Sequence, residues 1–183
     1  MRFYAACLAS YNNGVLFGRW IDACDDVDDM QAEVSAMLRE SRFPNVTVEH
    51  PETGEEVPSA EEWAIHDYEG LPSTLGEHPG LDAIADFVAL CEEYNMEPED
   101  LAAIVAHFGT MAYAKEELSD RFSGTYDSLR SYAEELADDM LRSHGIKEDH
   151  PLAQYFDYDQ FTHEMQHSHS VVELSSGVAV FSQ

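Results

Sequence analysis

The sequence predicts an α+β fold, arranged as an elongated chain of three small domains. Patterns typical of strands and turns occupy both ends of the chain, whereas residues 81–118 repeat their apolar positions with the period of an α-helix. A segment rich in proline and glycine, residues 70–80, separates the first pattern from the second. We therefore expect an α+β domain at 1–69, a mostly helical domain at 70–118 and a second α+β domain at 119–183.

The first domain is expected to begin with two strands and a helix. Apolar segments at Arg2–Ala9 and Val15–Ile21 flank Asn12-Asn13-Gly14, whose residues tolerate the positive φ angles of a tight turn. A helix is predicted from about Asp28, an N-cap residue type, to about Ser41. Its expected buried face consists of Met30, Val34, Met37 and Leu38.

The rest of the first domain is predicted to be less regular. Three prolines and one glycine within Phe43–Ser59 predict a loop, in which Val46–Glu49 is a strand candidate. Glu62–Tyr68 is a further strand candidate, and it would complete the α+β unit.

The central domain is predicted from helical periodicity. A first helix has an apolar stripe formed by Leu81, Ile84, Ala85, Val88 and Cys91. Pro98 suits the first turn of a second helix, where backbone N–H groups have no intrahelical partner, and Gly109 ends that helix. The apolar face of the second helix consists of Leu101, Ile104, Val105 and Phe108. A third helix is expected at about Met111–Leu118.

The third domain is expected to begin with a short strand and a long helix. The strand is predicted at Arg121–Tyr126, and Asp127 or Ser128 caps the helix, which runs to about His144. Its expected inward face consists of Leu129, Tyr132, Leu136, Met140 and Leu141.

A helix and a hairpin complete the third domain. The helix starts at Asp157, with Gln160 at the capping-box position. Ser170–Leu174 and Val178–Phe181 are apolar strands, and Ser175-Ser176-Gly177 between them predicts the turn of a hairpin.

Negative charge is the strongest compositional signal. The chain has 37 Asp and Glu against 9 Lys and Arg, a formal net charge of −28. Residues 43–114 contain sixteen acidic residues and neither Lys nor Arg. Protein surfaces usually mix both signs, because like charge opposes compaction. At 44% hydrophobic residues the chain still has material for a core, so we interpret the acidic surface as functional.

This charge restricts the class of partner. It repels nucleic acid and anionic membranes, and it attracts basic proteins, polyamines or cations. No segment approaches the length of a membrane span, and the first residues show no clear cleavage pattern of a signal peptide. Cys7, Cys24 and Cys91 lack paired spacing, so we expect reduced thiols and a cytoplasmic protein.

Two segments resemble metal sites. The segment His163-Glu164-Met165-Gln166-His167 matches the HExxH zinc signature, which makes a zinc-dependent hydrolase the alternative function. A third ligand would have to come from His169 or Glu173, and we interpret the match as incidental. Asp22, Asp26, Asp28 and Glu33 are spaced like EF-hand ligands, but Val27 stands where that loop needs glycine. We expect no metal site and no cofactor.

No other pattern indicates catalysis. Adjacent carboxylates are too numerous for any one pair to be singled out as an acid–base couple. The chain lacks a Gly-x-Ser-x-Gly elbow and a phosphate-binding glycine loop. We therefore expect no catalytic residues and no enzyme activity.

The charge can instead mimic a DNA duplex. Duplex DNA carries one charge per about 1.7 Å of axis, so a charge of −28 equals the phosphates of roughly fourteen base pairs. A row of small acidic domains could enter the basic groove of a DNA-binding enzyme. Adaptation to high salt would also produce an acidic surface with few lysines, and a general acidic protein-binding module is a further alternative. Composition alone leaves these interpretations open.

The order of motifs resembles one family. The chain is similar to the ArdA antirestriction proteins over nearly its whole length. The matching segments are FYAACLASYNNGVLFGRWIDA, EEWAIHDYEGLP, LAAIVAHFG, YDSLRSYAEEL, YFDYDQF and VELSSGVAVF, at residues 3–23, 61–72, 101–109, 126–136, 155–161 and 172–181. Two features depart from the family pattern, an apparently expanded loop at Phe43–Ser59 and the HEMQH segment.

The resemblance implies a function, a partner and an assembly. ArdA proteins mimic bent B-form DNA and occupy the DNA-binding groove of Type I restriction–modification enzymes, formed by the specificity and modification subunits, so that incoming mobile DNA escapes cleavage. It also implies three domains in a curved line and a homodimer formed through the C-terminal domain.

Binding is expected to be distributed over many carboxylates. Our candidates lie in the stretch without Lys or Arg and on the helices: Glu61, Glu62, Asp67, Glu69, Asp82, Asp86, Glu92, Glu93, Glu97, Glu99, Asp100, Glu134, Glu135, Asp138 and Asp139. Phe122 and Tyr126, on the expected strand of the third domain, are our candidates for the dimer contact.

Overall fold

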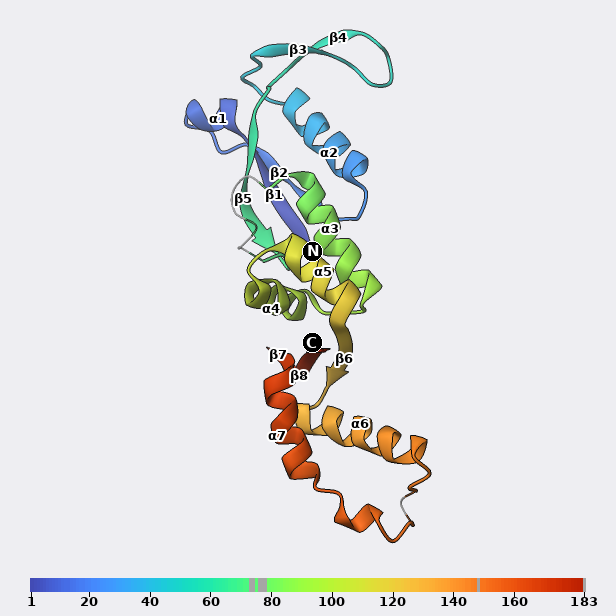
Figure 1. Cartoon of the computed structure of the whole chain (residues 1–183). Coiled ribbons are helices and arrows are strands. Elements are labelled where there is room, and N and C mark those ends of the chain that lie inside the picture. The colour runs from blue at the N-terminus through green and yellow to red at the C-terminus, as the bar shows by residue number, and fades with distance from the viewer. Residues whose placement is uncertain (73–74, 76–78, 148, 183) are drawn as a thin grey trace. The chain divides into compact units, whose positions relative to one another are not determined.

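The computed structural model describes residues 1–72, 75, 79–147 and 149–182. These residues form seven α-helices and eight strands in small antiparallel sheets, which confirms the α+β class (Figure 1). The chain divides into two compact units, Met1–Leu101 and Ala102–Gln183, which are described separately below. The arrangement in three domains stays a prediction.

The first unit is built on a three-stranded sheet in the order β2-β1-β5. Its strands are β1 (Arg2–Cys7), β2 (Gly18–Asp22) and β5 (Trp63–Glu69), and β1 pairs antiparallel with both neighbours. Gly18 is required at the start of β2, where β2 pairs with β1, because a Cβ atom there would lie 2.2 Å from the carbonyl oxygen of Ala5. The two strands expected at the N-terminus and the strand expected near Glu62 are therefore confirmed.

The connection between β1 and β2 differs from the expected hairpin turn. Residues Leu8–Asn12 form a short helix, α1, where we expected the end of a strand and a turn. The sulfur of Cys7 accepts a hydrogen bond from the backbone N–H of Ser10, and the hydroxyls of Ser10 and Ser41 lie 3.0 Å apart. The contact with Ser41, a residue far along the chain, favours a helical turn at a sequence that, read locally, predicts a strand. Asn13 and Gly14 then end α1 rather than joining two paired strands directly.

Helix α2 (Val27–Arg39) packs on this sheet. Its N-cap is Asp26, whose carboxylate accepts hydrogen bonds from the backbone N–H groups of Asp28 and Asp29 at 2.9 and 3.2 Å. The predicted helix is confirmed, with its cap two residues earlier than Asp28. Its four predicted inward residues, Met30, Val34, Met37 and Leu38, are all buried.

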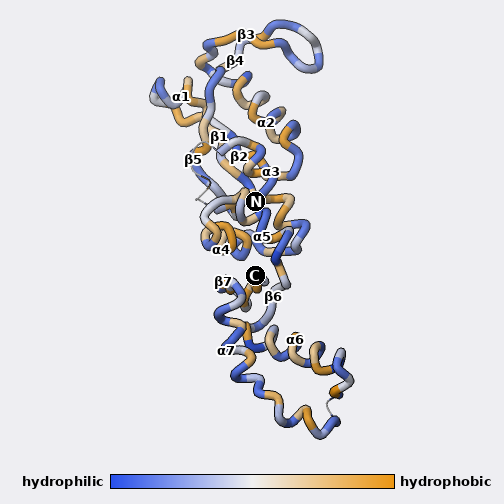
Figure 2. The backbone as a smooth tube through the Cα atoms, in the orientation of Figure 1, coloured by the Kyte–Doolittle hydropathy of each residue, from blue (hydrophilic) through white to orange (hydrophobic). Residues whose placement is uncertain are grey.

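The expected loop at Phe43–Ser59 is largely a two-stranded ribbon. Strand β3 (Val46–Glu49) was expected, whereas β4 (Glu56–Ser59) was not. The two strands pair from Val46 opposite Ser59 to Glu49 opposite Glu56. Proline suggests a loop, but Pro58 is tolerated because a two-stranded ribbon has only edge strands. Figure 2 shows that the turn joining β3 to β4 is hydrophilic.

Helix α3 (Leu81–Glu93) completes the core of the first unit by packing against α2. All five residues of its predicted apolar stripe are buried. The predicted linker, residues 70–80, lies partly outside the described residues. Helix α4 (Pro98–Phe108) follows with Pro98 in its first turn, as expected, and the boundary between the two units falls within this helix.

The second unit centres on a sheet in the order β6-β8-β7. Strands β6 (Phe122–Tyr126), β7 (His169–Leu174) and β8 (Gly177–Ser182) are all antiparallel, and the predicted hairpin β7–β8 is confirmed. Helix α5 (Met111–Arg121) precedes β6 and is one turn longer than expected. The buried Phe181 contacts the rings of Phe108 and Phe122, with centroids at 4.9 and 5.4 Å.

Helices α6 (Leu129–Ser143) and α7 (Tyr158–Ser168) pack on each other beside this sheet. Ser128 caps α6 and Asp157 caps α7, as expected, and a short 3₁₀ helix, Ala153–Tyr155, lies between them. Only half of the expected capping box forms, because the side chain of Gln160 donates to Glu164 instead of reaching back.

One part of the predicted inward face of α6 is wrong. Met140 is 45% exposed, whereas Ala133 and Ala137 are buried. The apolar cluster around Tyr132, Val178 and Val180 includes Leu136 but does not extend to Met140. The small sheet therefore covers only the first turns of α6, and periodicity alone could not show where that cover ends.

Candidate functional site

The acidic residues are divided unequally between the two units. Met1–Leu101 contains 23 acidic and 4 basic residues, and Ala102–Gln183 contains 14 and 5. The formal charges of the units are therefore −19 and −9. The first unit is the more strongly negative part of the chain.

The fifteen predicted binding carboxylates differ in exposure. Eleven are exposed: Glu61, Glu62, Asp67, Glu69, Asp82, Glu92, Glu93, Glu97, Glu99, Glu135 and Asp139. Three are half-buried: Asp86, Glu134 and Asp138. Asp100 is buried, with only 8% of its surface exposed. It lies in the first turn of α4, where the helix dipole favours a negative charge, so it contributes to the potential more than to direct contact.

Several candidates are already paired with the few arginines. Glu69 pairs with Arg2, Glu134 with Arg130, and Asp139 with Arg142, at 2.5–2.8 Å. The carboxylate of Asp138 accepts a hydrogen bond from the hydroxyl of Tyr158 at 2.6 Å. These carboxylates are locally neutralised or hydrogen-bonded and are less available to a partner.

Nine exposed candidates have no ion pair within the described part of the chain. They are Glu61, Glu62, Asp67, Asp82, Glu92, Glu93, Glu97, Glu99 and Glu135. All but Glu135 belong to the first unit, on and around β5, α3 and the start of α4. We call the eight carboxylates of the first unit the unpaired acidic surface.

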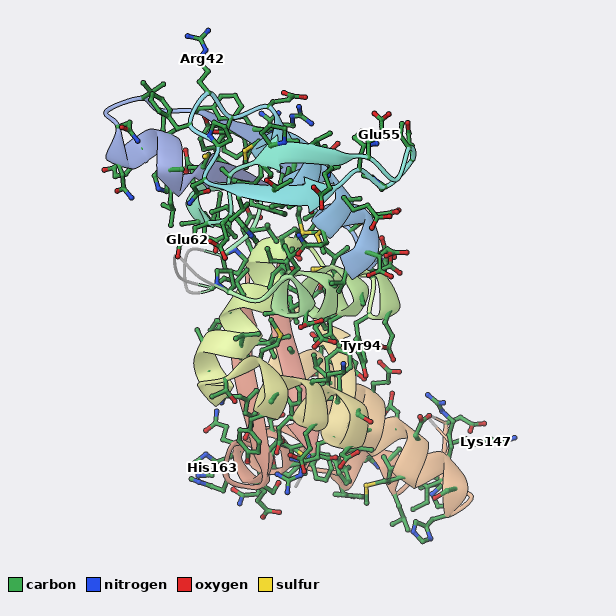
Figure 3. All side chains as sticks on the ribbon, turned by 90° about the horizontal axis from the view of Figure 1, so that it is seen from above. Arg42, Glu55, Glu62, Tyr94, Lys147 and His163 are labelled. Atoms are coloured by element: carbon green, nitrogen blue, oxygen red, sulfur yellow. The ribbon has the colours of Figure 1, made fainter. Side chains whose placement is uncertain are left out.

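The structure adds carboxylates that the sequence analysis left out. The β3–β4 ribbon carries exposed Glu49, Glu52, Glu55 and Glu56, and Figure 3 shows Glu55 projecting from its turn. They lie within the stretch without Lys or Arg, which was the signal that could have identified them.

Two ionisable groups, the Cys91 thiol and the Tyr68 hydroxyl, belong to the elements that carry this surface, α3 and β5. Burial, together with the nearby carboxylates of Glu97 and Glu92, raises the pKa of the Cys91 thiol to about 11. Burial also raises the pKa of Tyr68 to about 12. Both groups therefore stay protonated near neutral pH.

The HEMQH segment lies on α7, and no third ligand joins it among the residues that the structure describes. His163 and His167 are exposed and their ring centroids are 5.1 Å apart. The ring of His169, an expected ligand candidate, instead hydrogen-bonds the hydroxyls of Tyr132 and Ser168. Across the described ranges, no three His, Cys, Asp or Glu residues are grouped so as to hold a metal ion. In the EF-hand-like segment, the carboxylate of Asp26 serves as the N-cap of α2.

The predicted dimer contacts lie on an edge strand. Strand β6 is at one edge of its sheet, next to β8. Phe122 and Tyr126 are both half-buried. The ring of Tyr126 packs at a tilt against the ring of Tyr132, with centroids 4.9 Å apart. The hydroxyl of Tyr126 donates to the carbonyl of Ser123 at 3.0 Å. These two side chains pack within their own unit, and their role in a dimer stays a prediction.

Fold and surface together define an α+β protein that presents a large, mostly uncompensated anionic surface. Residues 3–180 match the family model described as antirestriction protein (ArdA). The match spans nearly the whole chain, and the chain belongs to the ArdA antirestriction protein family. The comparison with curated proteins found no match. Among the described helices, none combines the length and apolar character needed to cross a membrane.

Proposed function

We propose that this protein mimics B-form DNA and blocks Type I restriction–modification enzymes by occupying the groove between their specificity and modification subunits. The observation that carries this proposal is the unpaired acidic surface. Its carboxylates are exposed and have no ion pair in the described structure, so a basic groove can bind them without first breaking internal pairs. Family membership supports the antirestriction role.

The amount of charge fits a short duplex. At one charge per about 1.7 Å of axis, the −19 of the first unit corresponds to the phosphates of roughly ten base pairs. The mimic needs no base edges, because much of the attraction of a DNA-binding groove is to phosphates and independent of sequence. Binding is then spread over many carboxylates, each contributing a small part of the free energy.

We further propose a homodimer that acts in the cytoplasm. The outer edge of β6 is the proposed contact, since β6 is an edge strand of its sheet and edge strands can pair with a second copy. Dimerisation would double the charge presented to the enzyme. Sedimentation analysis checks this directly, because a single species at the 20.6 kDa of one chain would contradict the dimer.

A competition titration tests the function. Purified protein is added to a Type I methyltransferase core bound to a labelled duplex, at two salt concentrations. We expect displacement at near-stoichiometric protein, and weaker displacement at higher salt, because the interaction is electrostatic. No displacement at low salt and large excess would contradict the proposal for this enzyme.

A control separates specific mimicry from a general acidic module. The same titration is run with a basic DNA-binding protein unrelated to restriction enzymes. Equal affinity for both proteins would favour a general acidic protein-binding module, whereas a strong preference for the restriction–modification core supports the proposed function.

A further inference from the structure

The histidine pair on α7 is not used by the proposed function. His163 and His167 are four residues apart, which places them on one face of the helix in adjacent turns. Both are exposed, and Figure 3 shows His163 projecting away from the ribbon. Neither ring has a hydrogen bond within the described structure, and the two rings lie edge to face.

The separation of the two rings suits a shared metal ion. A ring nitrogen binds Zn²⁺ at about 2.0–2.1 Å, so two imidazoles on one ion have their ring centres about 5 Å apart. The ring centroids of His163 and His167 are 5.1 Å apart. Two histidines four residues apart on one helix face can bind one ion together, as they do in the HExxH motif.

The surroundings favour a cation at this point. The pair lies in the second half of α7, toward the negative end of the helix dipole. Helix α7 contains no Lys or Arg, and Glu164 is exposed beside the pair, its carboxylate accepting a hydrogen bond from the side chain of Gln160 at 3.2 Å. On the neighbouring helix α6, Arg130 is paired with Glu134 and Asp159.

We propose that His163 and His167 form a two-histidine surface site for a late first-row divalent cation, of the class of Zn²⁺, Ni²⁺ and Cu²⁺. Neutral imidazole suits these ions, whereas Mg²⁺ and Ca²⁺ prefer oxygen ligands. The remaining coordination positions are open to water, because no third side chain of ligand type joins the pair among the residues described. The site binds an ion without assembling the three-ligand centre of a zinc hydrolase.

Calorimetric titration of the full chain tests this site. NiCl₂ and, separately, ZnCl₂ are the probes, in excess Mg²⁺ so that the many carboxylates are already occupied. We expect one ion per chain, and an affinity lower by at least about tenfold in His163→Ala and in His167→Ala, since one imidazole alone cannot chelate. The matched control is His107→Ala, a single exposed histidine in the last turn of α4, which should leave binding unchanged.

A variant that keeps the composition tests the spacing. The double variant His167→Ser/Ser168→His exchanges two neighbouring residues. The second imidazole then lies on a different side of the helix from His163, so binding should weaken as much as in either alanine variant. Thermal melting without metal checks that each variant is folded. Unchanged Ni²⁺ affinity in both alanine variants, or no uptake of either ion by the wild-type chain in excess Mg²⁺, would overturn the proposal. The result is independent of the restriction assay.

Discussion

Asp26 and Asp100 are both aspartates, but they have different roles. Asp26 is exposed, but its carboxylate is engaged by the N–H groups at the start of α2. Asp100 was a candidate for partner binding, yet it is buried in the first turn of α4. The number of acidic residues therefore overstates the number that a partner can contact.

The cap formed by Asp26 predicts a specific loss of stability. Asp26→Ala should lower the free energy of unfolding by about 1 kcal/mol, because two backbone N–H groups of α2 lose their acceptor. Urea denaturation measures this change. Asp25→Ala is the control, since it removes the same charge from the adjacent exposed position. Equal effects of the two variants would show that charge rather than capping is responsible.

Tyr68 predicts a dependence of stability on alkaline pH. Burial raises its pKa to about 12 in the folded protein, above the ordinary value of 10.0. Its contribution to stability is complete below pH 10 and is lost between about pH 10 and 12, because the unfolded chain releases the proton first. In Tyr68→Phe the decline of the unfolding free energy over this range should be shallower. Tyr155→Phe, at a side chain that is 78% exposed, is the control and should keep the wild-type decline.

At the scale of elements, carboxylates differ in whether an ion pair neutralises their charge. Those on α3, at the start of α4 and on the β3–β4 ribbon differ in this respect from the paired carboxylates of α6. The end of α3 and the start of α4 bear four exposed carboxylates that form no ion pair with any described residue, Glu92, Glu93, Glu97 and Glu99. On α6, by contrast, Glu134 and Asp139 are paired with arginines of the same helix. Local pairing, rather than the number of charges, distinguishes these surfaces.

This difference predicts the outcome of neutralising blocks of residues. Changing Glu92, Glu93, Glu97 and Glu99 together to glutamine should weaken the displacement of duplex strongly, and should reduce the slope of log affinity against log salt by up to about 4. Each single change should have little effect, because binding is distributed. The competition titration measures both.

A second block with the same change in net charge is the control. It neutralises carboxylates that are already paired, namely Glu40, Glu69, Glu134 and Asp139. We expect a smaller effect, since a carboxylate that is already paired with an arginine is less available for contact with the enzyme. Equal effects of the two blocks would mean that net charge alone governs binding, and loss of inhibition by one single substitution would contradict distributed binding.

At the scale of the whole molecule, self-repulsion and function respond to salt in opposite directions. A net charge of −28 opposes the compact state, and salt screens that repulsion. The same screening weakens attraction to a basic groove. The melting temperature should therefore be higher in about 0.5 M NaCl than in about 0.05 M NaCl. Displacement of duplex should be weaker at the higher salt concentration.

This measurement also tests adaptation to high salt. The buried core includes Phe3, Phe87 and Phe181, so we expect a cooperative unfolding transition already at the lowest salt concentration. Circular dichroism recorded during heating follows this unfolding transition. A chain that folds only near molar salt would favour the halophile interpretation of the acidic composition over mimicry.

The sequence by itself determined the α+β class, most elements and the acidic character, because these depend on local periodicity and composition. The buried faces of α2 and α3 could be predicted in this way, since residues three and four apart share a face whatever the helix packs against. The ordered set of motifs also indicated the family that the match over residues 3–180 shows.

Only the tertiary structure decided which carboxylates are available and how α1, β4 and the end of α6 are arranged. The ion pair between Arg2 and Glu69 and the contact between Ser10 and Ser41 join residues far apart in the chain. The exposure of Met140 depends on where a neighbouring apolar cluster ends. Such contacts arise between distant segments, and no local pattern of residue types records which segments will meet.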